Sequence, residues 1–291
     1  MIKTLQEANR SEREAFKIPR SVHQSIPIRR IYRDGIWQVG NKFSRCWRFA
    51  DINYLVASEA DQRDMFMAYS SVINSLPTGA TAKITINNRR LNGDDFQHSV
   101  LMRSKGDKLD KYRQKYNAIL IEQAMSSSNL IQDKYITISV AKKQIDEART
   151  LFKRVDIDLA KGFGRLDSGA KPLDNHERLR IFYDFFRPGE ESDFRFDLSE
   201  LMRRGHSFKD HIAPDGMRFL ADHFEMGSQV GRVLFLRDYA SFIKDTMLTD
   251  LSDFPRNLMV SIDILPVPTN EAIKLLQSQI MAVESDITRW Q

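Results

Sequence analysis

Short apolar runs separated by glycine turns open the patterned part of the chain. Three runs rich in β-branched and aromatic side chains occupy residues 28–32, 36–39 and 43–49. Gly35 stands in the first gap between them and Gly40 in the second. Glycine-containing turns between such runs are typical of β-hairpins. The pattern therefore predicts a meander of three strands, preceded by a polar arm over residues 1–27.

Helical spacing follows the meander. Ser58 is a preferred N-cap residue, Glu59 and Asp61 suit the first turn of a helix, and apolar side chains from Met65 to Leu76 recur every three or four positions. We expect a helix here. By the same criteria the pattern then predicts a strand at 82–86, a helix at 109–125, a strand at 135–140 and a helix at 144–160 that stops at Gly162.

A second set of elements follows a linker-like stretch at 162–172 and a helix at 175–186. It comprises a hairpin with arms at 219–224 and 233–236, a helix at 240–251, a strand at 258–265 and a long helix at 269–290. Residues 235–240 also resemble residues 48–54. Because hairpin, helix, strand and long helix recur in one order, we expect an internal repeat.

The expected fold class is α+β, with two lobes that each form an antiparallel sheet covered by helices on one face, as in ferredoxin-like folds. The first lobe spans 28–163, a helical linker region 164–216 and the second lobe 217–291. The first set ends with one more strand and helix than the second. We therefore expect the second lobe to be incomplete and the chain to continue beyond Gln291.

The amino-acid composition indicates the cellular compartment in which the protein is expected. With 42% hydrophobic and 29% charged residues the chain has the balance of a folded globular protein rather than a disordered one. Its single cysteine, Cys46, cannot form an intramolecular disulfide. No signal peptide pattern opens the chain, and no stretch reaches the roughly 20 apolar residues that cross a bilayer. We expect a cytoplasmic protein.

Positive charge is concentrated near the N-terminus. Residues 1–50 carry 11 Lys/Arg and 4 Asp/Glu, whereas the whole chain has a net charge of only +5. Such an end suits an anionic partner, namely DNA or anionic lipid, although a solvated basic surface without a ligand fits equally well. The candidate residues for binding an anionic partner are Arg29, Arg30, Arg33, Lys42, Arg45 and Arg48.

The alternation of side chains along a strand indicates where the aromatic residues of this basic region lie. Phe43, Arg45, Trp47 and Phe49 fall on one face of the third strand. We therefore expect Trp47 to pack in a core, with the Arg45 side chain extending to solvent over it. Arginines rather than aromatic rings would then form the surface patch.

Chemistry-bearing motifs are weak throughout. Residues 164–172 approach a phosphate-binding loop, but Lys171 is followed by Pro172 instead of Ser or Thr. His206 and His211 are five residues apart, which is a poor spacing for a shared metal on a helix. The acidic pairs Glu190-Glu191 and Asp94-Asp95 lie in glycine-flanked loops, where they are expected to be solvated. Cys46 lies in a predicted strand, where a small buried apolar residue is the expected role. The sequence predicts no catalytic, cofactor-binding or metal site in this chain.

Four segments resemble a known family. They are residues 26–40 (IPIRRIYRDGIWQVG), 47–54 (WRFADINY), 236–240 (LRDYA) and 260–266 (VSIDILP). Together they are similar to the N-terminal region of the VirB-four/TraE-like conjugative type IV secretion ATPases of Gram-positive mobile elements. The resemblance is extended rather than tied to a diagnostic motif, and no catalytic residue of the family matches a position here.

The resemblance implies a docking and assembly domain at the cytoplasmic face of the cell membrane. Its partners would be inner-membrane secretion subunits and other copies of itself, and its basic N-terminal end could add DNA or anionic lipid. ATP and Mg²⁺ would bind in a RecA-like domain that follows residue 291, where the full-length protein would hydrolyse ATP. The alternative function is a stand-alone nucleic-acid-binding plasmid replication or mobilisation protein. A complete enzyme is the third reading, which the weak motifs above disfavour.

Overall fold

The computed structural model describes residues 19–90, 100–126, 130–198, 206–238, 242, 244, 246–254 and 256–290. Most of the expected N-terminal arm lies outside these residues. Its described end forms the short helix α2 (Val22–Ser25), which begins at the N-cap Ser21.

The predicted meander is confirmed. Strands β1 (Ile28–Ile31), β2 (Trp37–Val39) and β3 (Lys42–Phe49) pair antiparallel in sequence order. Gly35, between β1 and β2, has a positive φ of 77°, and a Cβ atom there would lie 2.8 Å from the Leu173 carbonyl oxygen. Glycine therefore satisfies both the turn geometry and the close approach of the two backbones.

Long-range pairing extends the meander into a seven-stranded antiparallel sheet. The main path runs β1-β2-β3-β5-β4-β10, where β5 is Leu130–Ala141, β4 is Ala80–Arg90 and β10 is Leu258–Ile264. A short strand, β6 (Ala170–Pro172), pairs with the end of β3. Strands β4 and β5 form the longest pair, from Ala80↔Val140 to Arg90↔Leu130.

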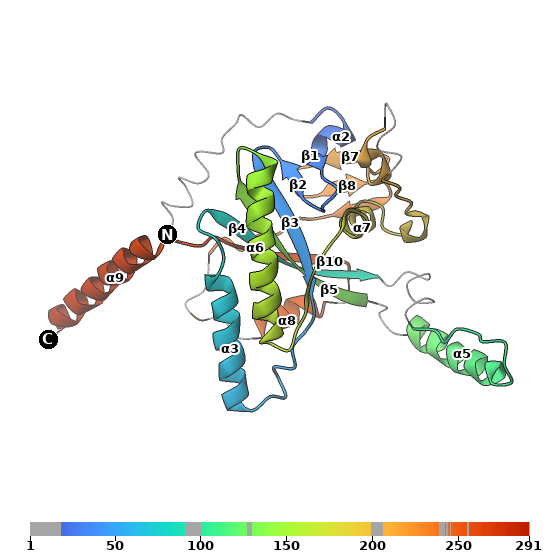
Figure 1. Cartoon of the computed structure of the whole chain (residues 1–291), viewed down its shortest axis with the longest axis horizontal. Helices are drawn as coiled ribbons and strands as arrows, with labels where there is room; N and C mark the ends of the chain where they lie inside the picture. Colours follow the sequence, from blue (N-terminus) through green and yellow to red (C-terminus); the bar gives the residue numbers. More distant parts are fainter. Residues whose placement is uncertain are drawn as a thin grey trace.

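Helices α3 (Glu59–Asn74) and α6 (Ile145–Gly164) lie side by side on one face of this sheet (Figure 1). As predicted, Ser58 caps α3. The α6 helix runs past Gly162, so the predicted stop there is wrong. A Cβ atom on Gly162 would lie 2.5 Å from a methyl group of Val72. The glycine lets α6 approach α3 closely instead of ending the helix.

Apolar side chains from both helices and the sheet form the main core. Its largest fully buried members include Trp47, Phe152, Ile136, Ile138 and Leu159. Phe43, Trp47 and Phe49 all contribute to this core, as alternation predicted, and Arg45 lies on the same face.

Helix α7 (Asn175–Phe186) packs on the opposite face, against β2 and β3. Two 3₁₀ segments, η1 (Glu191–Asp193) and η3 (Phe208–His211), follow it. Together with β1 and β2 they enclose a second core that contains Ile26, Ile28, Trp37, Leu179, Tyr183, Phe194 and Ile212.

A smaller antiparallel sheet follows, formed by β7 (Met217–Phe219), β8 (Phe224–Met226) and β9 (Gln229–Gly231). The predicted α+β class with two antiparallel sheets is therefore confirmed. The turn after Met226 is also where it was expected, but residues 233–236 form no strand. Helix α8 (Met247–Ser252) is shorter than the predicted helix at 240–251, of which residues 240, 241, 243 and 245 lie outside the described part.

The predicted internal repeat is wrong. Strand β10 pairs with β4 along its whole length, from Leu258↔Asn88 to Ile264↔Ala82, and so belongs to the first sheet. The hairpin at 217–231 forms a sheet of its own. The apolar positions of β10 align with Ile84 and Ile86, so joining the larger sheet extends an existing apolar face. The argument that the second lobe lacks a strand fails with the repeat.

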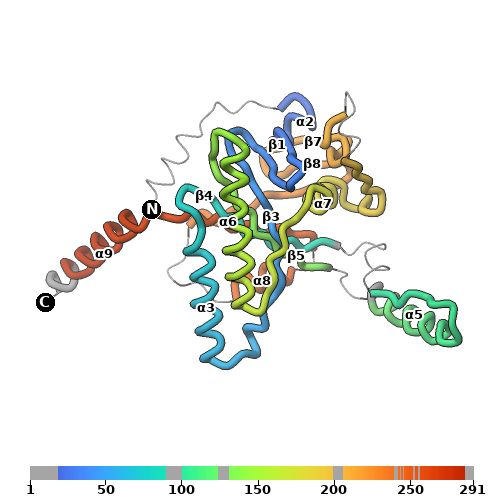
Figure 2. The backbone as a smooth tube through the Cα atoms, viewed as in Figure 1, coloured from blue at the N-terminus to red at the C-terminus, as the bar shows by residue number. Residues whose placement is uncertain are grey.

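Two helices project from the body rather than packing on it. Helix α5 (Asp110–Ser126) extends from the end of the β4–β5 pair, and α9 (Thr269–Trp290) extends beyond β10 (Figures 1 and 2). Both lie where helices were predicted. Within the described residues, no helix has the length and apolar character needed to span a membrane.

Candidate partner-binding surfaces

The structure distributes the six candidate basic residues over separate places. Arg29 and Arg30 lie on β1, an edge strand of the large sheet, and Arg33 lies in the turn that follows. All three side chains are exposed. Within the described part of the chain, they form no ion pair. They are the members of the predicted patch that remain available to an anionic partner.

Arg45 is engaged with helix α6. Its guanidinium lies 2.9 Å from the Asp156 carboxylate, which also accepts a hydrogen bond of 2.8 Å from Trp47 Nε1. The Arg45 side chain is 18% exposed. It extends over the Trp47 ring, 5.9 Å from the ring centroid. Alternation correctly placed Arg45 on the face of Trp47, but the side chain pairs with Asp156 instead of extending to solvent, so it is not available to a surface patch.

Arg48 projects from the opposite face of β3. Its guanidinium lies 3.8 Å from Asp133 and 5.7 Å from the Tyr135 ring centroid. Asp133 also receives Arg89 at 2.8 Å. Burial raises the pKa of the Tyr135 hydroxyl well above its ordinary value.

Lys42, at the start of β3, is partly buried and has an interaction partner. Arg48 is still 46% exposed beside Asp133, whereas Arg29, Arg30 and Arg33 are the exposed candidates that form no ion pair among the described residues.

Arg178, on α7, is a buried cation that sequence reasoning missed. It donates to the carbonyl oxygens of Gly35 and Ser44, at 3.0 and 3.1 Å, and lies 4.1 Å from the Trp37 ring centroid. Burial lowers its pKa to about 10. Burial likewise raises the pKa of the neighbouring Cys46 thiol. Because these contacts satisfy backbone groups of the meander, Arg178 joins α7 to the sheet rather than offering charge to a ligand.

The glycine-rich segment after α6 has structural partners. Ser168 donates to the Ala50 carbonyl oxygen at 2.7 Å, and Lys171 pairs with Glu177 at 2.8 Å. Residues 170–172 form β6, so this segment completes the sheet.

The histidines and acidic pairs that were considered as metal ligands or catalytic residues have the following surroundings. Among the described residues, no group of three His, Cys, Asp or Glu side chains is arranged to hold a metal ion. His206 is exposed, and the Nδ1 atom of His211 lies 3.0 Å from the Arg195 carbonyl oxygen. Glu190 pairs with Arg187 at 2.8 Å, and Glu191 accepts from the Gly189 amide. The pair Asp94-Asp95 lies outside the described residues.

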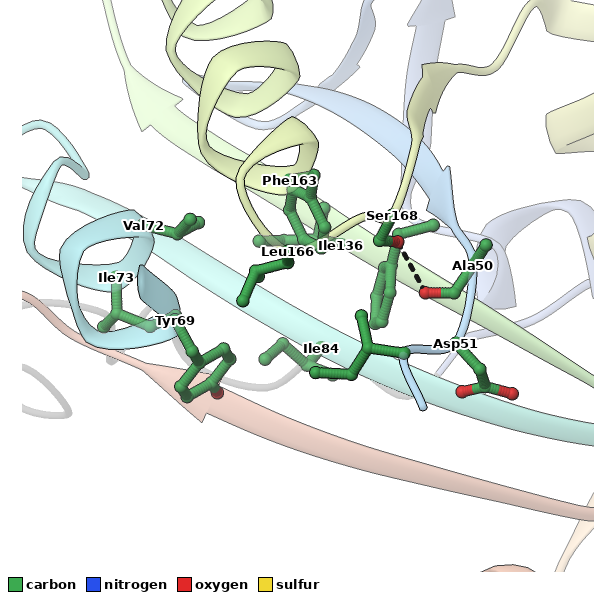
Figure 3. Close-up of a pocket in the computed structure, with 12 residues that line it drawn as sticks. Ala50, Asp51, Tyr69, Val72, Ile73, Ile84, Ile136, Phe163, Leu166 and Ser168 are labelled. Carbon is green, nitrogen blue, oxygen red and sulfur yellow. Dashed lines mark hydrogen bonds between the residues drawn. The ribbon is translucent and has the colours of Figure 1, made fainter. Parts of the chain in front are cut away.

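A small apolar pocket opens between α3, the end of α6 and the sheet (Figure 3). Its volume is about 190 Å³. The lining residues are Phe49, Ala50, Asp51, Ile52, Tyr69, Val72, Ile73, Ile84, Ile136, Phe163, Leu166 and Ser168. The Ser168 hydroxyl is committed to Ala50, and Asp51 pairs with Lys134. Partial burial raises the pKa of Tyr69. The lining suits a small apolar group and gives no nucleophile an adjacent base.

Helix α9 presents an apolar seam to solvent. Ile273, Leu276, Ile280 and Val283 are spaced three, four and three residues apart, which is the spacing of heptad core positions. Each of these side chains is about half exposed. Ser278 and Ser285 lie on the opposite side of the helix, where Leu275 and Met281 are also exposed. Such a seam packs against another helix in coiled coils, so α9 is a second candidate surface, for a protein partner.

Comparison of the chain with protein-family models and with curated proteins gives no match.

Proposed function

We propose that this chain is a docking and assembly domain of a conjugative type IV secretion motor, which holds the motor against membrane channel subunits and neighbouring copies. The observation that carries the proposal is the projecting α9 helix with its exposed apolar seam. The resemblance of residues 26–40, 47–54, 236–240 and 260–266 to the VirB-four/TraE-like ATPases indicates which kind of machine the chain would belong to.

The energetics of α9 favour a protein partner. A fully buried aliphatic side chain stabilises a contact by about 1.5–3 kcal/mol relative to its exposed state. Four such side chains lie along one line of α9, from Ile273 to Val283, and each is about half exposed. A helix of the same heptad pattern, from a channel subunit or a second copy, would cover them. The chain's role is then structural, and a RecA-like domain with ATP and Mg²⁺ would supply the work.

A DNA-transfer assay tests this role. In cells that carry the mobile element, the gene is altered to encode Ile273→Asp, Leu276→Asp and Ile280→Asp together. A matched triple, Ser278→Asp, Ala282→Asp and Ser285→Asp, adds the same charge on the side of α9 away from the seam. Losing two or more buried contacts costs about 3–6 kcal/mol, so transfer should fall at least about 100-fold for the first triple. Transfer should stay near normal for the second, at equal protein levels.

Two outcomes would contradict the proposal. Equal transfer by the two triple variants would show that the seam of α9 has no partner in the process. A reading frame that closes directly after Gln291 would leave no place for the phosphate loop and Mg²⁺-binding strand of the motor. An in-frame continuation that encodes both motifs would support it.

The alternative, a stand-alone nucleic-acid-binding replication or mobilisation protein, would use Arg29, Arg30 and Arg33. Its test is the salt dependence of binding to DNA. If the three exposed arginines contact phosphates, replacing all three by Ala should lower the slope of log affinity against log salt by about three. A slope unchanged by the substitutions, together with impaired transfer in the α9 variant, leaves the docking role as the better account.

A further inference from the structure

The α5 arm carries a second basic surface, distinct from the N-terminal edge. Residues 100–109 run outward beside α5, and the chain then returns through the helix toward β5 (Figures 1 and 2). The Asn117 side chain fixes the two segments to each other, because it bonds both the amide and the carbonyl group of Met102 at 2.9 Å. The arm is a hairpin of loop and helix whose tip lies at the start of α5.

Internal hydrogen bonds build the tip. The Asp110 carboxylate accepts from the Ser104 hydroxyl at 2.5 Å and from the Lys105 and Gly106 amides at 3.1 and 2.8 Å. These bonds, led by the one from Ser104, lower the pKa of Asp110. Arg113 bridges Asp110 and Asp107. Both acidic residues of the tip, Asp107 and Asp110, therefore bind groups within the tip itself.

The charge left for a partner is positive. Residues 103–116 contain 6 Lys/Arg and 2 Asp. Because Arg113 is occupied by the two aspartates, the exposed cations are Arg103, Lys105, Lys108, Lys111 and Lys115. Lys111 and Lys115 lie four residues apart on one side of α5, and Lys108 lies in the turn just before the helix.

An apolar stripe runs directly beside these lysines. The stripe consists of Leu109, Tyr112, Tyr116 and Ile119. The first three each follow one of the lysines in sequence, and Ile119 lies on the same face of the helix as Tyr112 and Tyr116. Their exposed fractions are 57%, 59%, 48% and 52%. The Lys111 ammonium lies 4.9 Å from the Tyr112 ring centroid. Because consecutive helix positions are about 100° apart, the lysines line one side of α5 and the apolar stripe lines the adjacent side.

This combination suits a lipid surface better than a nucleic acid. Phosphates of DNA would engage the lysines but leave Leu109 and Ile119 exposed to water. At a bilayer, aliphatic side chains reach the acyl boundary, tyrosines prefer the interface, and lysines meet the anionic headgroups. We propose that the tip of the α5 arm, with Lys108, Lys111 and Lys115 beside Leu109 and Tyr112, docks on the surface of an anionic bilayer.

The inference deepens the proposed docking function and rests on it only for its biological setting. Vesicle binding measures the α5 arm directly, whereas the α9 variants measure contact with protein partners. Each of the two proposals can therefore fail while the other stands.

The test is co-sedimentation of the full chain with phosphatidylcholine vesicles that either contain or lack phosphatidylglycerol. The first variant replaces Lys108, Lys111 and Lys115 by Gln, and the second replaces Leu109 and Tyr112 by Ser. The matched control replaces Arg29, Arg30 and Arg33 by Gln, which removes the same charge at the β1 edge. Circular dichroism checks that each variant keeps the wild-type fold.

We expect binding only to vesicles with the anionic lipid. Each lysine near such a surface contributes about fivefold to partitioning, so the lysine variant should bind roughly 100-fold more weakly. The Leu109 and Tyr112 variant should also lose binding, by about tenfold or more. The β1-edge control should bind much more strongly than the lysine variant.

Several outcomes would overturn the inference. They are no binding to anionic vesicles, equal losses in the lysine variant and the β1-edge control, or unchanged vesicle binding after Leu109 and Tyr112 are replaced. In the last case, a parallel loss of single-stranded DNA binding in the lysine variant would assign the arm to nucleic acid instead.

Discussion

The two faces of the large sheet are joined to their helices by two tryptophans with different surroundings. Trp47 lies on the face of α3 and α6, and its indole N–H donates to Asp156 at 2.8 Å. Trp37 lies on the face of α7 and donates to Asn175 at 2.9 Å. Both rings are 1% exposed. Around Trp47 the contacts are mainly apolar, whereas Trp37 lies under the buried guanidinium of Arg178.

The difference shows two ways of attaching a helix to a sheet. Helix α6 buries a full apolar stripe that includes Phe152 and Leu159, so packing holds it, and the bond to Asp156 at the rim adds little. Helix α7 is attached through buried polar groups as well. Asn175 and Arg178 together donate to backbone oxygens of Tyr32, Gly35 and Ser44. Such bonds fix one position of the helix because any other leaves them unmade.

The largest expected effect comes from the apolar face. Phe152→Ala should lower the free energy of unfolding by about 3–5 kcal/mol, because Phe152 is fully buried and packs near the Trp47 ring. Urea denaturation measures the change. The control Ile157→Ala lies on the same helix but is 68% exposed. It should cost less than about 0.5 kcal/mol, and similar losses in both variants would contradict this picture of α6.

The polar partners of the two tryptophans give a sharper comparison. Asn175→Ala leaves the Trp37 N–H buried without a partner, and the Tyr32 carbonyl oxygen keeps only its bond from the Gly35 amide, so the substitution should cost about 2–3 kcal/mol. Asp156→Ala should cost only about 1 kcal/mol, since the Asp156 side chain is 27% exposed and water can replace it. The same denaturation experiment compares them. A larger loss for Asp156→Ala would reverse the assignment of the polar and apolar faces.

The smallest effect concerns pH. Burial raises the pKa of Asp184, on α7, to about 6, although Arg180 lies 2.7 Å away. Because the folded state binds this proton more tightly than the unfolded state, the fold loses stability as pH rises from about 4 to about 6. The loss is roughly 1–2 kcal/mol. Asp184→Asn should remove it, so the stability difference between variant and wild type should change across that range. If the stability difference between variant and wild type is the same at every pH in this range, the buried Asp184 carboxyl is not the source of the pH-dependent loss of stability.

Local features of the fold were predictable from the sequence. Gly35 and Gly40 marked the turns of the meander, Ser58 marked the start of α3, and alternation placed Trp47 in the core with Arg45 over it. The candidate basic patch was predicted less well. Arg45 and Arg48 differ by an odd number of positions, so alternation already places them on opposite faces of β3. That signal was present in the sequence and could have divided the patch.

The sequence by itself determined most of the strands and helices, though not β6 or the absence of a strand at 233–236, and it determined which face of β3 is apolar and that positive charge collects near the N-terminus. Only the tertiary structure decided that β10 lies beside β4, that Arg178 is buried against Trp37, and that α5 and α9 project from the body. The reason is physical. Apolar spacing and capping act over a few residues, whereas strand pairing depends on which of several similar apolar faces meet, and β4 and β10 are about 170 residues apart.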